Sequence, residues 1–113
     1  MAGIWKDSNN TIIINPDGTY IWTIRMSGEN TIWECTKGII SNYVLIETAK
    51  YRKPEKIEWI IDKSKQYTVY TEIPEDEWEI YDSKKAGYQM IYRGTSFGLR
   101  TDNHVTNYNF AKQ

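Results

Sequence analysis

The chain has 113 residues, and its 14 basic and 15 acidic side chains give a formal net charge of −1. This length provides for one hydrophobic core, and the balanced charge excludes the strongly basic surface that is typical of nucleic-acid-binding proteins. A single Cys and a single His exclude an internal disulfide and a zinc site of the Cys/His type. We therefore expect one domain over residues 1–113, with neither nucleic acid nor a metal ion as a partner.

Large aromatic side chains with a polar group are frequent, since five Trp and nine Tyr stand against two Phe. Such rings suit β-strands, and they also suit pockets where one end of the ring meets water or a ligand. No segment is long and apolar enough to predict a membrane span. Residues 1–7 lack the apolar segment of a signal peptide, which leaves open an intracellular protein or an exported one whose signal has been removed.

The first half of the chain predicts short strands separated by turns about every ten residues, a spacing typical of antiparallel barrels and meanders. We predict four strands here, at residues 11–15, 19–26, 31–37 and 43–48. Alternation is clearest in the second, where every other residue from Tyr20 to Met26 is apolar. Gly38 interrupts the third strand and predicts a bulge or a corner.

The second half predicts a hairpin of residues 57–61 and 67–71, and a further strand at 88–93. Residues 72–87 are ambiguous, because a proline followed by acids and two lysines followed by glycine are helix start and stop signals. Residues 78–82 also read as a strand with a loop after it, and we favour this strand because it brings the count to eight. The Asn-rich tail, 95–113, is expected to form a weak hairpin around Asp102 and Asn103 or to lie across the barrel.

Three sequence features occur together in a recognisable order. Gly3-Ile4-Trp5 has the Gly-x-Trp pattern, Asp17-Gly18-Thr19-Tyr20 turns into the second strand, and residues 38–45 run from glycine to leucine with Ile40 where Trp is usual. With Arg93, they make residues 3–94 resemble a small bacterial lipocalin-like (calycin) domain. The resemblance implies an all-β fold, a single antiparallel up-and-down β-barrel of about eight strands. It also implies that Arg93 packs on Trp5 and closes one end, an attraction of about 0.5–2 kcal/mol.

A barrel of eight strands either fills its interior with side chains or holds one small ligand. The resemblance implies an inward, ligand-binding set of large side chains: Tyr20, Trp22, Trp33, Trp59 and Met90. Trp and Tyr rings stack on planar or apolar molecules while offering N–H and O–H donors. Our leading hypothesis is non-enzymatic binding of a small apolar or aromatic molecule in the barrel interior, and a solid aromatic core is its alternative.

Catalytic and cofactor motifs are missing from the sequence, so we expect neither an enzyme nor a cofactor. His104 is expected at the surface, whereas an inward Cys35 is the one side chain that could serve as a nucleophile. The alternative function is a protein-interaction or inhibitor module, bacterial or from a phage, that uses the outer surface and loops. Its expected exposed anchors are Tyr51, Trp78 and Phe97.

Overall fold

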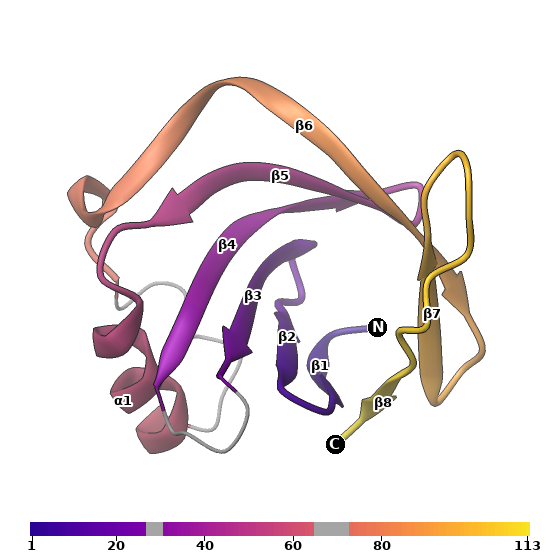
Figure 1. The fold of residues 1–113 in the computed structure, drawn as a ribbon, viewed down its shortest axis with the longest axis horizontal. Helices are drawn as coiled ribbons and strands as arrows, with labels where there is room; N and C mark the ends of the chain where they lie inside the picture. The colour runs from indigo at the N-terminus through magenta and orange to yellow at the C-terminus, as the bar shows by residue number, and fades with distance from the viewer. Residues whose placement is uncertain (27–30, 65–72) are drawn as a thin grey trace.

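The computed structural model describes residues 1–26, 31–64 and 73–113 (Figure 1). The strands in these ranges are β1 (Gly3–Asp7), β2 (Asn10–Ile14), β3 (Thr19–Arg25), β4 (Ile32–Ser41), β5 (Val44–Tyr51), β6 (Trp78–Tyr92), β7 (Ser96–Arg100) and β8 (Phe110–Lys112). The helices are α1 (Pro54–Ser64) and the 3-10 turn η2 (Glu75–Glu77). None of the described helices is long and apolar enough to cross a membrane.

Every strand pairs antiparallel with the next one along the chain, and β8 pairs with β1, so the sheet closes into a barrel. The predicted fold class, a single antiparallel up-and-down β-barrel of about eight strands with lipocalin-like topology, is confirmed. Closure removes the unpaired backbone groups that an open sheet would present at its edges.

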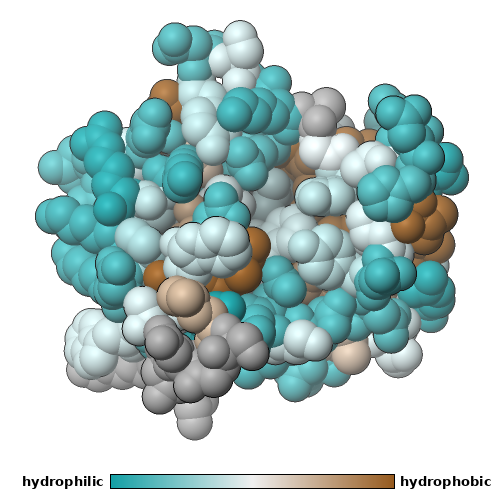
Figure 2. Space-filling model, in the orientation of Figure 1, coloured by the Kyte–Doolittle hydropathy of each residue, from teal (hydrophilic) through white to brown (hydrophobic). Residues whose placement is uncertain are grey.

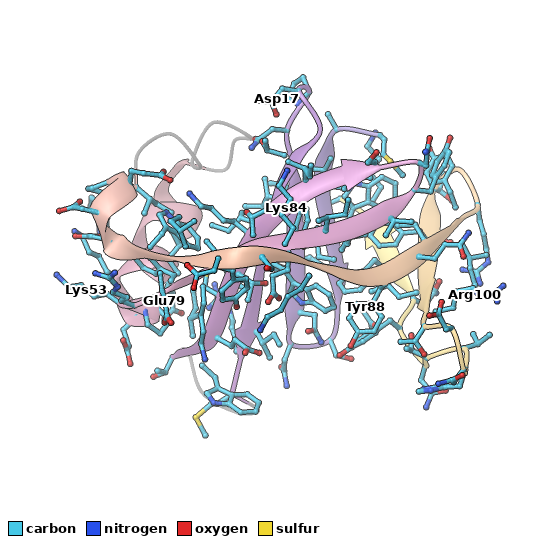
Figure 3. The ribbon with its side chains drawn as sticks, turned by 90° about the horizontal axis from the view of Figure 1, so that it is seen from above. Asp17, Lys53, Glu79, Lys84, Tyr88 and Arg100 are labelled. Atoms are coloured by element: carbon cyan, nitrogen blue, oxygen red, sulfur yellow. The ribbon has the colours of Figure 1, made fainter. Side chains whose placement is uncertain are left out.

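Up-and-down connectivity assigns each turn to one of two barrel ends. The β1–β2 and β7–β8 connections and α1 belong to one end, which we call the open end. Both chain termini and the β2–β3, β4–β5 and β6–β7 turns belong to the other, which we call the terminal end. Figure 3 shows the β2–β3 turn, with Asp17, at the top and the β7–β8 connection at the bottom.

Two hydrophobic cores lie on the two faces of the curved sheet, because successive residues of a strand point to opposite sides. Ile12 and Ile14 belong to the core inside the barrel, whereas Ile13 between them belongs to a second, outer core. The outer core lies against α1, whose Ile57 is fully buried. Figure 1 shows α1 beside β4 and below the ends of β5 and β6.

The predicted strand at residues 57–61 is wrong, because this segment lies in α1. Pro54 begins the helix and Glu55 lies in its first turn, an arrangement that favours a helix start. Isoleucines at positions 57, 60 and 61 also follow the helical spacing i, i+3, i+4. The partner strand predicted at 67–71 lies outside the described residues.

The predicted strand at residues 78–82 is confirmed, but the loop predicted after it is wrong. Trp78–Tyr92 is one strand of 15 residues. β6 takes up its additional length through register shifts: Glu47 pairs with Lys85, and two residues later Ala49 pairs with Ile80. The acids after Pro74 form only the short turn η2.

The predicted barrel limit at residue 94 is too early, because β7 and β8 come from the segment 95–113. The hairpin expected around Asp102 and Asn103 is confirmed by the β7–β8 pairing and by a bridge between Arg100 and Val105. Phe97, Leu99 and Phe110 bury their side chains inside the barrel from this otherwise polar segment.

Candidate ligand-binding site

Trp5 fills the terminal end of the barrel. Its side chain is fully buried, its ring lies 5.0 Å from Phe97 and 6.1 Å from Tyr92 between centroids, and its Nε1 donates to the Met1 carbonyl oxygen. The cation over the Trp5 ring is Lys112, with its Nζ 5.6 Å from the centroid. Lys112 pairs with Trp5 across β1 and β8, which explains its position.

The resemblance implied that Arg93 packs on Trp5 and closes this end of the barrel, but Lys112 occupies that position. Arg93 is exposed, and its Nη1 donates to the Asn109 Oδ1 at 3.3 Å. The resemblance placed the last barrel strand before residue 94, whereas the strand that pairs with β1 is β8. The predicted packing of Arg93 on Trp5 is corrected to packing of Lys112 on Trp5.

Three of the five predicted inward residues lie inside the barrel. Tyr20, Trp22 and Met90 are buried in the inner core. The inward placement of Trp33 and Trp59 is wrong, since these side chains are 66% and 63% exposed. Trp59 lies on α1 rather than on a strand, and Trp33 lies where the β3–β4 register shifts.

Trp22 forms an aromatic cluster with two half-buried tyrosines that the inward set did not include. Its ring centroid lies 5.6 Å from both Tyr88 and Tyr108, and the two tyrosine rings lie 6.2 Å apart. Asn10 fixes the indole by accepting a hydrogen bond from the Trp22 Nε1 at 2.9 Å. Figure 3 shows Tyr88 on the side of β6 away from Asp17, toward the open end.

Beneath this cluster the barrel is filled with side chains. Phe97 and Phe110 are fully buried and stack with their centroids 5.1 Å apart, and Phe110 also contacts Trp22 at 5.7 Å. Rings therefore continue from Trp5 at the terminal end to Tyr88 and Tyr108 at the open end. In Figure 2 pale side chains, with some brown ones, occupy the middle of the face, and teal side chains cover much of the surface around them.

Two open depressions flank the tyrosines of this cluster. The larger has a volume of about 430 Å³ and is lined by Glu47, Lys85, Gly87, Tyr88, Thr101, Asp102 and Asn103. The smaller has a volume of about 280 Å³ and is lined by Asp7, Ser8, Asn10, Asn107 and Tyr108. Each depression thus combines one tyrosine ring with carboxylate and amide groups.

The hydroxyls of Tyr81 and Tyr108, at this end of the barrel, remain protonated. Burial, followed by a hydrogen bond to Glu47 and the charges of nearby glutamates, raises the pKa of Tyr81 to about 12. Burial, followed by Tyr88 and the charges of Asp7 and Glu34, also raises the pKa of Tyr108. Both hydroxyls are therefore neutral hydrogen-bond donors at physiological pH.

Cys35 belongs to the outer core rather than to the barrel interior. Its side chain is fully buried, and burial raises the pKa of its thiol well above the usual range. A protonated, inaccessible thiol is a poor nucleophile. His104 is exposed, as predicted, and the described residues contain no group of three or more His, Cys, Asp or Glu side chains that could hold a metal ion.

The anchors expected for a protein-interaction module are buried, so their predicted exposure is wrong. Tyr51 and Trp78 are each 2% exposed and pair across β5 and β6 in the outer core, and Phe97 lies in the inner core. Trp33 and Trp59 are the described tryptophans with large exposed areas.

Of the two tyrosines, Tyr88 has an inward position that the sequence pattern indicates. Tyr88 alternates with Met90 in a predicted strand, which places both on one face. Tyr108 lies in the Asn-rich tail, where no pattern predicts an inward side chain. The chain matches no protein-family model, no curated protein and no solved structure.

Proposed function

We propose that this chain binds a small molecule at the open end of the barrel, without catalysing a reaction. The observation that carries this proposal is the pair of half-buried rings, Tyr88 and Tyr108, each lining a depression and both supported by Trp22. Small-molecule sites in proteins typically combine concave shape, aromatic walls and a few convergent polar groups.

The ligand has a planar or apolar part that rests on the tyrosines. Phe97, Phe110 and Trp5 fill the interior below, so the ligand lies in the mouth of the barrel rather than at its centre. Trp22 is held by its hydrogen bond to Asn10, so the ring beneath the tyrosines is fixed before binding. A site fixed in this way loses little conformational entropy when it is occupied.

We also infer kinship with the small bacterial lipocalin-like domains. The closed eight-strand topology and the position of Gly3-Ile4-Trp5 on β1 support it. Ile40 in place of Trp and Lys112 in place of Arg93 over Trp5 are departures from the family pattern. Fold alone does not define a ligand, so the proposal rests on the tyrosine site.

Native mass spectrometry of protein purified without denaturation from the cells that make it tests the proposal. We expect an added mass of a few hundred daltons that is lost on denaturation. The double variant Tyr88→Ala/Tyr108→Ala should lose this mass, whereas Tyr43→Ala, which removes an exposed tyrosine at the terminal end, should keep it. Detection of only the bare chain, or of its complex with another protein, would contradict small-molecule binding.

A further inference from the structure

The charge around the two depressions is predominantly negative. Asp7 lines the smaller depression, and Glu47 and Asp102 line the larger one. Glu34 on β4 lies close enough to influence both Tyr81 and Tyr108 electrostatically. Lys85 is the one Lys or Arg among the described residues that line either depression.

Glu34 and Glu47 are half-buried carboxylates that point toward the mouth. Glu34 pairs with Ile24 of β3 and Glu47 with Gly38 of β4, in register with the inward-facing residues of these strands. Within the described part of the chain, neither carboxylate has a Lys or Arg nitrogen within 4.0 Å. Partly buried charges are screened less by water and salt than exposed ones, so both carboxylates attract cations in the mouth.

The position of Lys85 shows that a cationic group fits beside Glu47 at the open end of the barrel. It pairs with Glu47 across β5 and β6, but its Nζ lies over the Tyr81 ring, 4.3 Å from the centroid. Glu47 in turn lies close enough to Tyr81 to contribute to the raised pKa of its hydroxyl. An ammonium group therefore already rests on a tyrosine face beside a carboxylate, which is the arrangement that binds organic cations in proteins.

We propose that the ligand of the open end is an organic cation, with its amine or guanidine group directed to Glu47 and Glu34 and its planar part on Tyr88. This inference rests on the proposed function and adds the sign of the ligand's charge. An anionic ligand of the same shape is disfavoured, because it would place like charges together in a partly buried site.

Three indole probes of similar size test the inference: tryptamine, which is cationic at pH 7, neutral indole, and anionic indole-3-propionate. Their dissociation constants are measured by isothermal titration calorimetry at pH 7 on the full chain. We expect tryptamine to bind about tenfold more tightly than indole-3-propionate, a ratio that corresponds to about 1.4 kcal/mol.

Two variants and one control test whether the preference for tryptamine over indole-3-propionate arises at the open end of the barrel. Glu47→Gln should reduce the preference for tryptamine over indole-3-propionate about fivefold, and Lys85→Gln should increase this preference about threefold because a competing cation is removed. Glu55→Gln makes the same charge change on an exposed residue of α1 and should leave the preference as it is. The neutral probe also reports whether each variant keeps its folded site.

The outcomes separate this inference from the function on which it rests. Indole binding with equal affinity for the two charged probes, or with preference for indole-3-propionate, would overturn the cationic ligand and leave the binding function standing. Equal loss of preference in Glu47→Gln and Glu55→Gln would overturn the role of Glu47. Absence of binding by all three probes at millimolar concentration would overturn both.

Discussion

Gly38 lies where the backbone of β5 leaves no room for a side chain on β4. A Cβ atom at this position would lie 1.9 Å from the Ile46 carbonyl oxygen, and the β4–β5 register shifts at the same point, as the glycine in the sequence predicted. Gly38→Ala should therefore lower the free energy of unfolding by about 3 kcal/mol, because two strands must move apart. Urea denaturation followed by circular dichroism measures this change.

Gly94→Ala is the matched control for Gly38→Ala. Gly94 has a φ of +94° in the β6–β7 turn, and a Cβ atom there would meet no atom within 4 Å. Only the left-handed backbone opposes this substitution, at about 1–2 kcal/mol. Equal destabilisation by both variants would show that close approach at Gly38 is unimportant.

Tyr43 has a backbone conformation that non-glycine residues rarely adopt. Asn42 and Tyr43 have φ values of 50° and 62° in the two-residue turn between β4 and β5, where Asn-Gly is the preferred pair. Tyr43→Gly should raise the free energy of unfolding by about 0.5–1 kcal/mol, because relief of the left-handed backbone strain exceeds the loss of stacking on Tyr92. Tyr43→Ala loses the ring and keeps the strain, so thermal unfolding should show it less stable than the parent chain.

Two buried groups of the outer core, a thiol and a tyrosine hydroxyl, make the free energy of unfolding depend on pH in the alkaline range. Burial raises the pKa of the Cys35 thiol and of the Tyr51 hydroxyl, and Glu77 adds to the effect on Tyr51. Both groups stay protonated in the folded chain while they ionise in the unfolded chain, from about pH 8.5 for Cys. The free energy of unfolding should therefore fall as the pH rises from 8 to 10.

Cys35→Ala isolates the contribution of the thiol to this pH dependence. The variant should be less stable at pH 7, because it leaves a cavity in the outer core, but its stability should fall less steeply above pH 8.5. Parallel curves of unfolding free energy against pH for the two proteins would contradict a buried, protonated thiol.

At the scale of elements, Glu77 joins the end of β5 to α1. Its carboxylate accepts hydrogen bonds from the Tyr51 hydroxyl at 2.7 Å and the Lys56 Nζ at 2.8 Å. Lys56 and then Tyr51 lower the pKa of Glu77, so its charged form stabilises the fold above the unfolded pKa of about 4.5, and this contribution is lost as the pH falls through the lower, folded value.

Glu77→Gln should accordingly lower the melting temperature at pH 7, and its difference from the parent chain should shrink below pH 4. Scanning calorimetry across this pH range measures both effects. Glu55→Gln changes an exposed residue of α1, the helix that contains Lys56, and should change the melting temperature little at either pH. A difference for Glu77→Gln that is constant from pH 7 to pH 3 would contradict the role of the carboxylate charge.

Strands with strict alternation could be predicted from the sequence, and elements determined by long-range pairing could not. β3 alternates from Tyr20 onward and was predicted within one residue. β8 has three residues, and only its pairing with β1 and β7 makes it a strand. α1 was missed because a run rich in isoleucine and tryptophan fits a strand as well as a helix, and its partner face on β4 is distant in sequence.

In the whole molecule, the residues of the candidate site that long-range pairing positions also could not be predicted from the sequence. The resemblance implied that Trp22, Met90 and Trp33 point inward. Trp22 and Met90 do so, whereas Trp33 is turned outward by a register shift that no local pattern reveals. Tyr108 reaches the mouth because the β7–β8 hairpin returns across the open end. Local pattern therefore predicted the strands of a barrel or meander, and the resemblance added the barrel and part of its lining, whereas the arrangement of the open end depends on closure.

Mapping indole on the folded chain by ¹H–¹⁵N correlation spectra tests whether the open end of the barrel binds a small molecule. We expect the largest amide shifts on titration to surround Tyr88 and Tyr108, in β6 and in the β1–β2 and β7–β8 connections, and to saturate together. Shifts confined to the surroundings of the exposed Trp33 and Trp59, or no saturable shifts at all, would contradict a ligand site at the open end of this barrel.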